Sequence, residues 1–126
     1  KFVVLTGGEP MLQVNSELIE ALHEFSFKVA IETNGTIHCP KNIDWICVSP
    51  KFGSKLVQKS GDELKLVYPQ EGFSPNNFLN LDFKHFLIQP MDGLRAKENI
   101  KKAVQFCKLN PEWQLSIQTH KMTGIR

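Results

Sequence analysis

The chain has 126 residues, of which 41% are hydrophobic, and this length and composition fit one globular domain. Its formal net charge of +2 is too weak to favour nucleic-acid binding, and no apolar run approaches the roughly 20 residues of a membrane span. The three cysteines are odd in number and lack C-x-x-C spacing, which argues against a disulfide framework and favours a reducing, cytoplasmic setting.

Six short apolar stretches predict strands. In chain order they are Phe2–Thr6, Lys28–Glu32, Trp45–Ser49, Leu64–Tyr68, His85–Gln89 and Trp113–Gln118. Most of them are continuous apolar runs rather than clean alternations. That pattern favours strands covered on both faces, as in parallel sheets.

Two intervals between these strands predict helices. Apolar residues recur at helical spacing at Leu18, Ile19, Leu22 and Phe25, after Asn15 or Ser16 as N-cap, and at Ala96, Ile100, Ala103, Val104 and Cys107, before Asn110-Pro111. The segment 53–61 is a candidate for a short helix, and 75–81 for a turn or two. The order of elements predicts an α/β architecture with right-handed crossovers between parallel strands.

Polar or turn-forming residues follow every predicted strand. Because the carboxyl ends of parallel strands share one edge of a sheet, we expect one composite site there. The segments are Thr6-Gly7-Gly8-Glu9-Pro10, Glu32-Thr33-Asn34-Gly35, Ser49-Pro50-Lys51, Tyr68-Pro69, Gln89-Pro90-Met91-Asp92 and Gln118-Thr119-His120-Lys121.

The first of these segments has two interpretations. Gly7 and Gly8 let the backbone approach a ligand closely, and Glu9 adds an acceptor for an ammonium or hydroxyl group. The same residues also suit a plain strand-to-helix turn with Glu9 near a helix N-terminus. No G-x-x-x-x-G-K pattern follows, so a phosphate-binding loop is disfavoured.

The other segments also allow more than one interpretation. Ser49 and Lys51 suit a carboxylate or a sugar hydroxyl, although a solvated lysine at a strand end explains the same pattern. Residues 89–92 suit an adenine edge and its ribose, or a loop with a packed methionine. Glu32 places an acid at the sheet edge, and His120 lies in a polar cluster. No histidine pair has metal-ligand spacing.

Taken together, these motifs resemble the radical S-adenosylmethionine enzymes, and more narrowly the 7-carboxy-7-deazaguanine synthase family of queuosine and other deazapurine biosynthesis. The first motif is shared by many radical enzymes, whereas the closing segment 113–121 is more specific. The resemblance spans nearly the whole chain. It rests on the segments 6–10, 31–36, 48–51, 87–92 and 113–121.

The resemblance implies a partial, modified (β/α)₆ barrel and a carbon–nitrogen lyase. The implied reaction is a radical-mediated ring contraction of 6-carboxy-5,6,7,8-tetrahydropterin to 7-carboxy-7-deazaguanine with release of ammonia. It uses S-adenosylmethionine, a [4Fe–4S] cluster and magnesium. The implied partners are the pterin substrate, a reductant such as flavodoxin, and a second copy of the enzyme in a homodimer.

The resemblance also implies residue roles. The methionyl amino group of S-adenosylmethionine is assigned to Gly7, Gly8 and Glu9, its carboxylate and ribose side to Ser49, Pro50 and Lys51, and its adenosine to Gln89, Pro90, Met91 and Asp92. The substrate is assigned to Thr6 and Arg126. Further candidates are Glu32, Asn34 and His120, and no catalytic or metal-ligating residue is assigned.

One departure from the family is severe. The family holds its cluster with a CxxxCxxC run upstream of the first strand, and this chain has no such run. Three thiolates must lie close together to share a cluster, and Cys39, Cys47 and Cys107 lack the spacing. We therefore expect the C-terminal part of a single core domain, inactive by itself. The alternatives are another small radical enzyme, such as a glycyl-radical activase, or a cluster-less binding module.

Overall fold

A computed structural model describes residues 1–125, and the chain divides into two compact units. Unit 1 comprises Lys1–Leu64 and Asn80–Lys84, and unit 2 comprises Lys65–Leu79 and the chain from His85 onward. Two strands pass through both units, and each unit is described by itself. The expected single core domain stays a prediction.

Unit 1 is built on parallel strands. They are β1 (Phe2–Leu5), β2 (Lys28–Thr33), β3 (Trp45–Val48) and the first part of β4 (Ser60–Tyr68). In the register, Val3 lies beside Val29, and Ile31 lies beside Ile46. The first three strands therefore lie where the apolar runs predicted them, to within a residue at each end.

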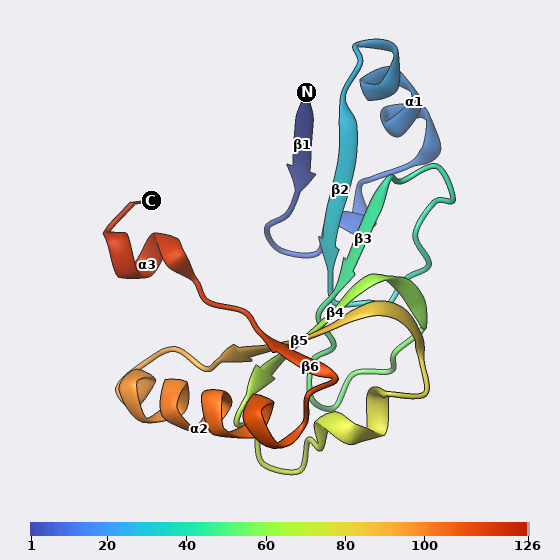
Figure 1. Cartoon of the computed structure of the whole chain (residues 1–126). Helices are drawn as coiled ribbons and strands as arrows, with labels where there is room; N and C mark the ends of the chain where they lie inside the picture. The colour runs from blue at the N-terminus through green and yellow to red at the C-terminus, as the bar shows by residue number, and fades with distance from the viewer. Residues whose placement is uncertain (126) are drawn as a thin grey trace. The chain divides into compact units, whose positions relative to one another are not determined.

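One face of this sheet is covered by helix α1 (Ser16–Glu24), which follows the 3₁₀ turn η1 (Pro10–Leu12) (Figure 1). Ile19 is completely buried against Val29 and Ile31. The helix is capped by Asn15, whose side-chain oxygen accepts the Leu18 N–H at 3.0 Å. The apolar stripe of α1 thus faces the core, as its periodicity predicts.

The opposite face of β1 is open, and the expectation that the strands are covered on both faces is wrong there. Phe2 and Val4 are 59% and 47% exposed. Successive side chains of a strand point to opposite faces, and α1 packs on only one of them. The open face contains a shallow hollow of about 480 Å³, which Phe2, Val4 and Trp45 help to line.

Unit 2 contains the remaining elements. They are the ends of β4 and β5 (Asp82–Pro90), the 3₁₀ turn η2 (Pro75–Phe78), α2 (Ala96–Leu109), β6 (Trp113–Leu115) and α3 (Thr119–Thr123). Trp113 is 2% exposed and packs with its ring 5.4 Å from Phe86 and 6.3 Å from Phe106, centroid to centroid. These aromatic contacts hold α2 against β5 and β6.

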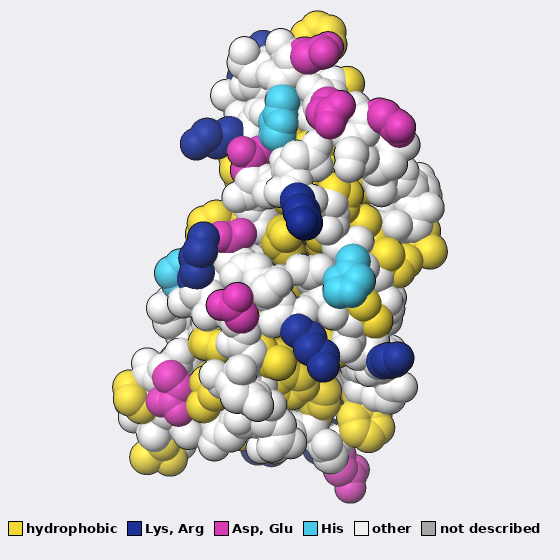
Figure 2. Space-filling model, turned by 90° about the vertical axis from the view of Figure 1, so that its right-hand side faces the viewer, with side chains coloured by type: hydrophobic (Ala, Val, Ile, Leu, Met, Phe, Trp, Pro, Cys, Tyr) yellow, Lys and Arg dark blue, Asp and Glu magenta, His cyan; other side chains and the backbone are white. Residues whose placement is uncertain are grey.

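The α/β class is confirmed. Hydrogen-bonded strand neighbours follow chain order from β1 to β6, and β1 and β6 stand at the two ends of this order, as expected of a partial barrel. The pairs β1–β2, β2–β3, β3–β4 and β5–β6 are parallel. No helix within residues 1–125 is long and apolar enough to cross a membrane. On the face drawn in Figure 2, Lys and Arg side chains are interspersed with Asp and Glu.

Four local predictions are wrong. The segment 53–61 forms no helix, because the Val57 and Gln58 N–H groups donate to the Gly35 carbonyl at 2.8 and 2.9 Å and β4 begins at Ser60. Strand β4 begins at Ser60, not at Leu64, and strand β5 begins at Asp82, not at His85. The last predicted strand ends at Leu115 instead of Gln118, and α3 follows it. The turn expected in 75–81 is present as η2.

Candidate functional site

The turn after β1 is open on its outer side. Gly7 and Gly8 have φ values of +86° and +53°, and a β-carbon built on either residue meets no atom within 4 Å. Both residues are exposed. The positive φ explains why glycine stands here, and the empty space leaves the backbone accessible to a ligand.

The Glu9 side chain points back into unit 1. Its Oε1 accepts the Thr33 hydroxyl at 2.6 Å and the Met11 N–H at 3.0 Å, and its Oε2 accepts the Asn34 N–H at 2.7 Å. A carboxylate has about four acceptor positions, so the donors among residues 1–125 leave one, on Oε2. Glu9 therefore ties the glycine turn to the end of β2.

Thr33 is a residue that the sequence argument missed. It is 3% exposed, and its hydroxyl donates to Glu9 while accepting the Gly35 N–H at 3.1 Å. Its carbonyl accepts the Ser49 N–H at 2.7 Å. Thr33 thus connects the ends of β1, β2 and β3. The only available signal was its position inside the polar segment after β2.

The predicted substrate residue Thr6 and the further candidate Glu32 lie together at the ends of β1 and β2. The Thr6 hydroxyl donates to Glu32 Oε2 at 3.5 Å, and both residues are exposed. Asn34 has a local role, since its Oδ1 accepts the Thr36 N–H at 2.9 Å in an Asx turn. Thr6 and Glu32 consequently present a hydroxyl and a carboxylate at this edge.

An ammonium and a hydroxyl lie together after β3. Lys51 Nζ donates to Ser49 Oγ at 3.1 Å. Lys51 is exposed, whereas Pro50 between them is buried and fixes the backbone. This pair can bind a carboxylate or a sugar hydroxyl.

Unit 2 contains a pocket of about 350 Å³ at the end of β5. Its lining comes from three elements and comprises Pro90, Met91, Asp92, Ala96, Lys97, Ile100, Ile117, Gln118 and Lys121. The buried Asn99 fixes one wall, because its Nδ2 donates to the Met91 carbonyl at 2.8 Å. The volume lies at the lower end of small-molecule pockets.

A charged pair stands at the rim of this pocket. Lys121 Nζ donates to Asp92 Oδ2. The hydrogen bonds from Lys121 and from the Gly93 N–H lower the pKa of Asp92, so its carboxylate is ionised at neutral pH. Gln89 and His120 do not line the pocket, and His120 is exposed on α3.

The predicted site residues therefore divide between the units. Unit 1 holds Thr6, Gly7, Gly8, Glu9, Glu32, Asn34, Ser49, Pro50 and Lys51, and unit 2 holds Gln89, Pro90, Met91, Asp92 and His120. Arg126 lies outside the described residues. That all of them form one composite site stays a prediction.

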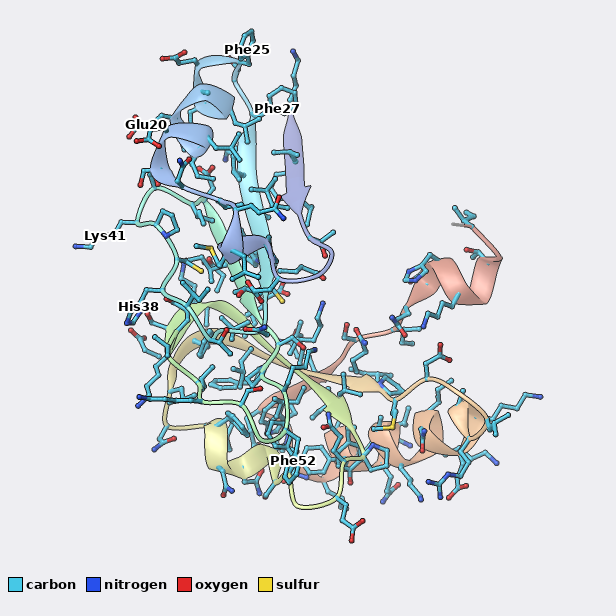
Figure 3. The ribbon with its side chains drawn as sticks, turned by 180° about the vertical axis from the view of Figure 1, so that it is seen from behind. Glu20, Phe25, Phe27, His38, Lys41 and Phe52 are labelled. Atoms are coloured by element: carbon cyan, nitrogen blue, oxygen red, sulfur yellow. The ribbon has the colours of Figure 1, made fainter. Side chains whose placement is uncertain are left out.

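The described residues do not fit an iron–sulfur cluster. Within residues 1–125 no three His, Cys, Asp or Glu side chains come together as metal ligands, and no disulfide joins any of the three cysteines. Burial, and after it the charge of Glu9, raises the pKa of Cys39 to about 11, and burial raises that of Cys107. His38 lies in the loop after β2 (Figure 3), with Nδ1 3.4 Å from Gln58 Oε1.

Comparisons with known proteins confirm the resemblance. The chain is 56% identical over 126 residues to the 7-carboxy-7-deazaguanine synthase of Bradyrhizobium diazoefficiens, covering all of this chain and 60% of that protein. It is 44% identical over 124 residues to the protein of the same name from Bacteroides thetaiotaomicron, covering 98% of this chain and 65% of that protein. The chain thus spans about 60% of the length of the first of these relatives. No family model matches.

The fold comparison agrees. A crystal structure of QueE from Escherichia coli superposes with a TM-score of 0.65 at 24% sequence identity, covering 93% of this chain and 56% of that one. At this identity the likeness concerns the fold alone. It supports the α/β assignment of a partial barrel.

Proposed function

We propose that this chain is part of a 7-carboxy-7-deazaguanine synthase, an enzyme of the queuosine and 7-deazapurine pathway. The observation that carries the proposal is the 56% identity along all 126 residues to a protein of that name. Because the chain spans only part of such proteins, the activity belongs to the whole protein. Residues 1–126 alone lack the cluster cysteines and are expected to be inactive.

The proposed reaction is the ring contraction of 6-carboxy-5,6,7,8-tetrahydropterin to 7-carboxy-7-deazaguanine with loss of ammonia. S-adenosylmethionine, together with a [4Fe–4S] cluster and Mg²⁺, supplies the radical chemistry when bound. The cluster has no ligand set among the described residues, so this chain contributes binding and orientation.

Unit 1 is proposed to bind the methionyl end of S-adenosylmethionine. The open backbone of Gly7 and Gly8 and the remaining acceptor position on Glu9 Oε2 suit its ammonium group. The ammonium of Lys51, held beside Ser49 and shaped by Pro50, suits its carboxylate and ribose side.

Unit 2 is proposed to bind the adenosine. Pro90 and Met91 supply apolar surface, and the ionised Asp92 accepts ribose hydroxyls. Gln89, at the end of the same strand, is proposed to read the adenine edge. The pocket also offers Ile117 and Gln118, which the sequence argument quoted without assigning a role.

The pterin is proposed to meet Thr6 and Arg126, with Glu32, Asn34 and His120 as further candidates. The hydroxyl and carboxylate at the ends of β1 and β2 match the donors and acceptors of a pterin ring. A reductant such as flavodoxin, a homodimeric assembly and a cytoplasmic location belong to the same proposal.

The test uses the full-length protein, reconstituted anaerobically and supplied with the carboxypterin, S-adenosylmethionine and a reductant. We expect 7-carboxy-7-deazaguanine by mass spectrometry, and none when S-adenosylmethionine is omitted. An intact cluster without deazapurine product would refute the assignment. A glycyl-radical activase would instead act on a protein and leave the pterin unchanged.

A further inference from the structure

We propose that Thr33 and Glu9 form a positioning pair that fixes the Gly7-Gly8 turn against the end of β2. Thr33 does not have to touch the ligand for the pair to matter, because the pair determines where the backbone of the turn and the free oxygen of Glu9 stand. The inference rests on the proposed function only for the identity of the ligand, the ammonium end of S-adenosylmethionine.

The first argument is that nothing packs on the side of the turn to which side chains at Gly7 and Gly8 would point, within the part of the chain that the structure describes. Neither Gly7 nor Gly8 has a neighbour within 4 Å of its β-carbon position, and both are exposed. Gly35, in the segment after β2, is tightly packed by contrast, because a β-carbon there would lie 2.7 Å from both Leu56 and Val48. A turn without packing on that side needs another constraint if it is to hold a ligand in one place.

The second argument is that Glu9 supplies this constraint. Its carboxylate accepts from a residue two positions away, Met11, and from residues 24 and 25 positions away, Thr33 and Asn34. All three distances lie between 2.6 and 3.0 Å, as expected for bonds to a charged acceptor. The residue directly after the turn is therefore bonded to β2.

The third argument is that Thr33 orients the carboxylate. Its hydroxyl has one proton, and since it accepts from the Gly35 N–H, that proton is directed to Glu9 Oε1. Oε1 then has both acceptor positions filled, by Thr33 and Met11, which leaves the free position on Oε2. The pair thus determines both the place of the turn and the oxygen that remains for a ligand.

The experiment measures binding of S-adenosylhomocysteine to the full-length protein by calorimetry, in wild type and in Thr33→Val, Thr33→Ser, Thr36→Val and Glu9→Gln. We expect Thr33→Val to weaken binding about tenfold, because valine keeps the shape but loses the hydroxyl. Thr33→Ser retains the hydroxyl and should stay within about threefold of wild type. Thr36→Val removes a hydroxyl from the same loop, away from Glu9, and serves as the matched control.

A double-mutant cycle tests whether Thr33 acts through Glu9. We expect Thr33→Val to cost less affinity in a Glu9→Gln background than in wild type, since the glutamine amide has one acceptor oxygen where the carboxylate has two and can no longer accept the same set of hydrogen bonds. Additive losses, a Thr33→Val affinity equal to wild type, or a loss that Thr33→Ser does not recover would each overturn the proposal. Should Thr33→Val fail to fold, Thr33→Ala, which also lacks the hydroxyl, is compared with Thr33→Ser by the same tenfold and threefold limits.

Amide hydrogen exchange separates this proposal from the proposed function. If wild type binds no S-adenosylhomocysteine, the cofactor assignment fails. The protection of the Asn34 N–H against exchange then still decides the positioning role. Protection that is lower in Thr33→Val than in wild type, but unchanged in Thr33→Ser, supports that role. Equal protection in all variants overturns it.

Discussion

Gly35→Ala is expected to be the most destabilising alanine substitution among the glycines of the site region. Gly35 has φ +76°, and its β-carbon position lies 2.7 Å from Leu56 Cδ1 and from Val48 Cγ1. A left-handed backbone costs alanine about 1–2 kcal/mol, and overpacking costs about 1–3 kcal/mol more. The sum of about 2–5 kcal/mol is a large part of the usual stability of a domain.

Gly53→Ala separates these two contributions. Gly53 has nearly the same backbone angle, φ +79°, but no atom lies within 4 Å of its β-carbon position. The difference between the two variants in the free energy of unfolding of the full-length protein, measured by urea denaturation, therefore isolates packing at about 1–3 kcal/mol. Trimming Leu56 to Ala in the Gly35→Ala background should recover part of the loss. Equal losses for Gly35→Ala and Gly53→Ala would refute the reasoning.

Three further predictions follow from the described contacts. Lys51→Ala should weaken S-adenosylhomocysteine binding to the full-length protein about tenfold or more in calorimetry. Lys55 is an exposed lysine outside the site, so Lys55→Ala should leave the affinity unchanged. Equal affinities of the two variants would remove Lys51 from the site. The pKa of Cys39 is raised from 9.0 to about 11, so at pH 8 the folded protein should hold about a hundredfold less Cys39 thiolate than the urea-unfolded protein. Iodoacetamide should therefore label Cys39 slowly until the protein unfolds. Mass spectrometry would detect the difference. Hydrogen bonds from the Val29 N–H and from His23 lower the pKa of Asp44. The stabilisation that the Asp44 carboxylate gives to the folded protein is therefore present above the unfolded pKa of Asp44 and is lost as the pH falls through its folded pKa. Asp44→Asn should therefore be less stable at pH 7 and lose less stability on acidification, and unchanged pH dependence in thermal melts would contradict this.

Several features of the fold were predictable because they depend on neighbours in the sequence. The spacing of Ile19 and Leu22 determines which side of α1 is apolar, and Asn15 caps the helix through the N–H of Leu18, three residues away. Short β-branched runs such as 28–32 determine the strands. Such local signals need no knowledge of the rest of the chain.

Strand ends were harder to predict. Ser60–Glu63 lacks a continuous apolar run, yet it belongs to β4, because Asp62 accepts the Ile46 N–H at 2.8 Å and pairs with Lys84 at 2.7 Å. Those partners are distant in the sequence. The open face of β1 could not be predicted from the sequence either. A strand with apolar side chains on both faces has the same sequence pattern whether one face or both faces are covered.

The sequence alone determined that a Gly-Gly turn follows a strand and that an acid comes next. The ligand of this turn stays a prediction that rests on the resemblance. Figures 1 and 3 show this turn at the opposite end of β2 from Phe25 and Phe27. Only the tertiary structure decided that the Glu9 carboxylate turns inward to Thr33 and Asn34, 24 and 25 residues away. The physical reason is that a hydrogen bond depends on distance in space, and only the parallel pairing of β1 with β2 brings these groups within 3 Å.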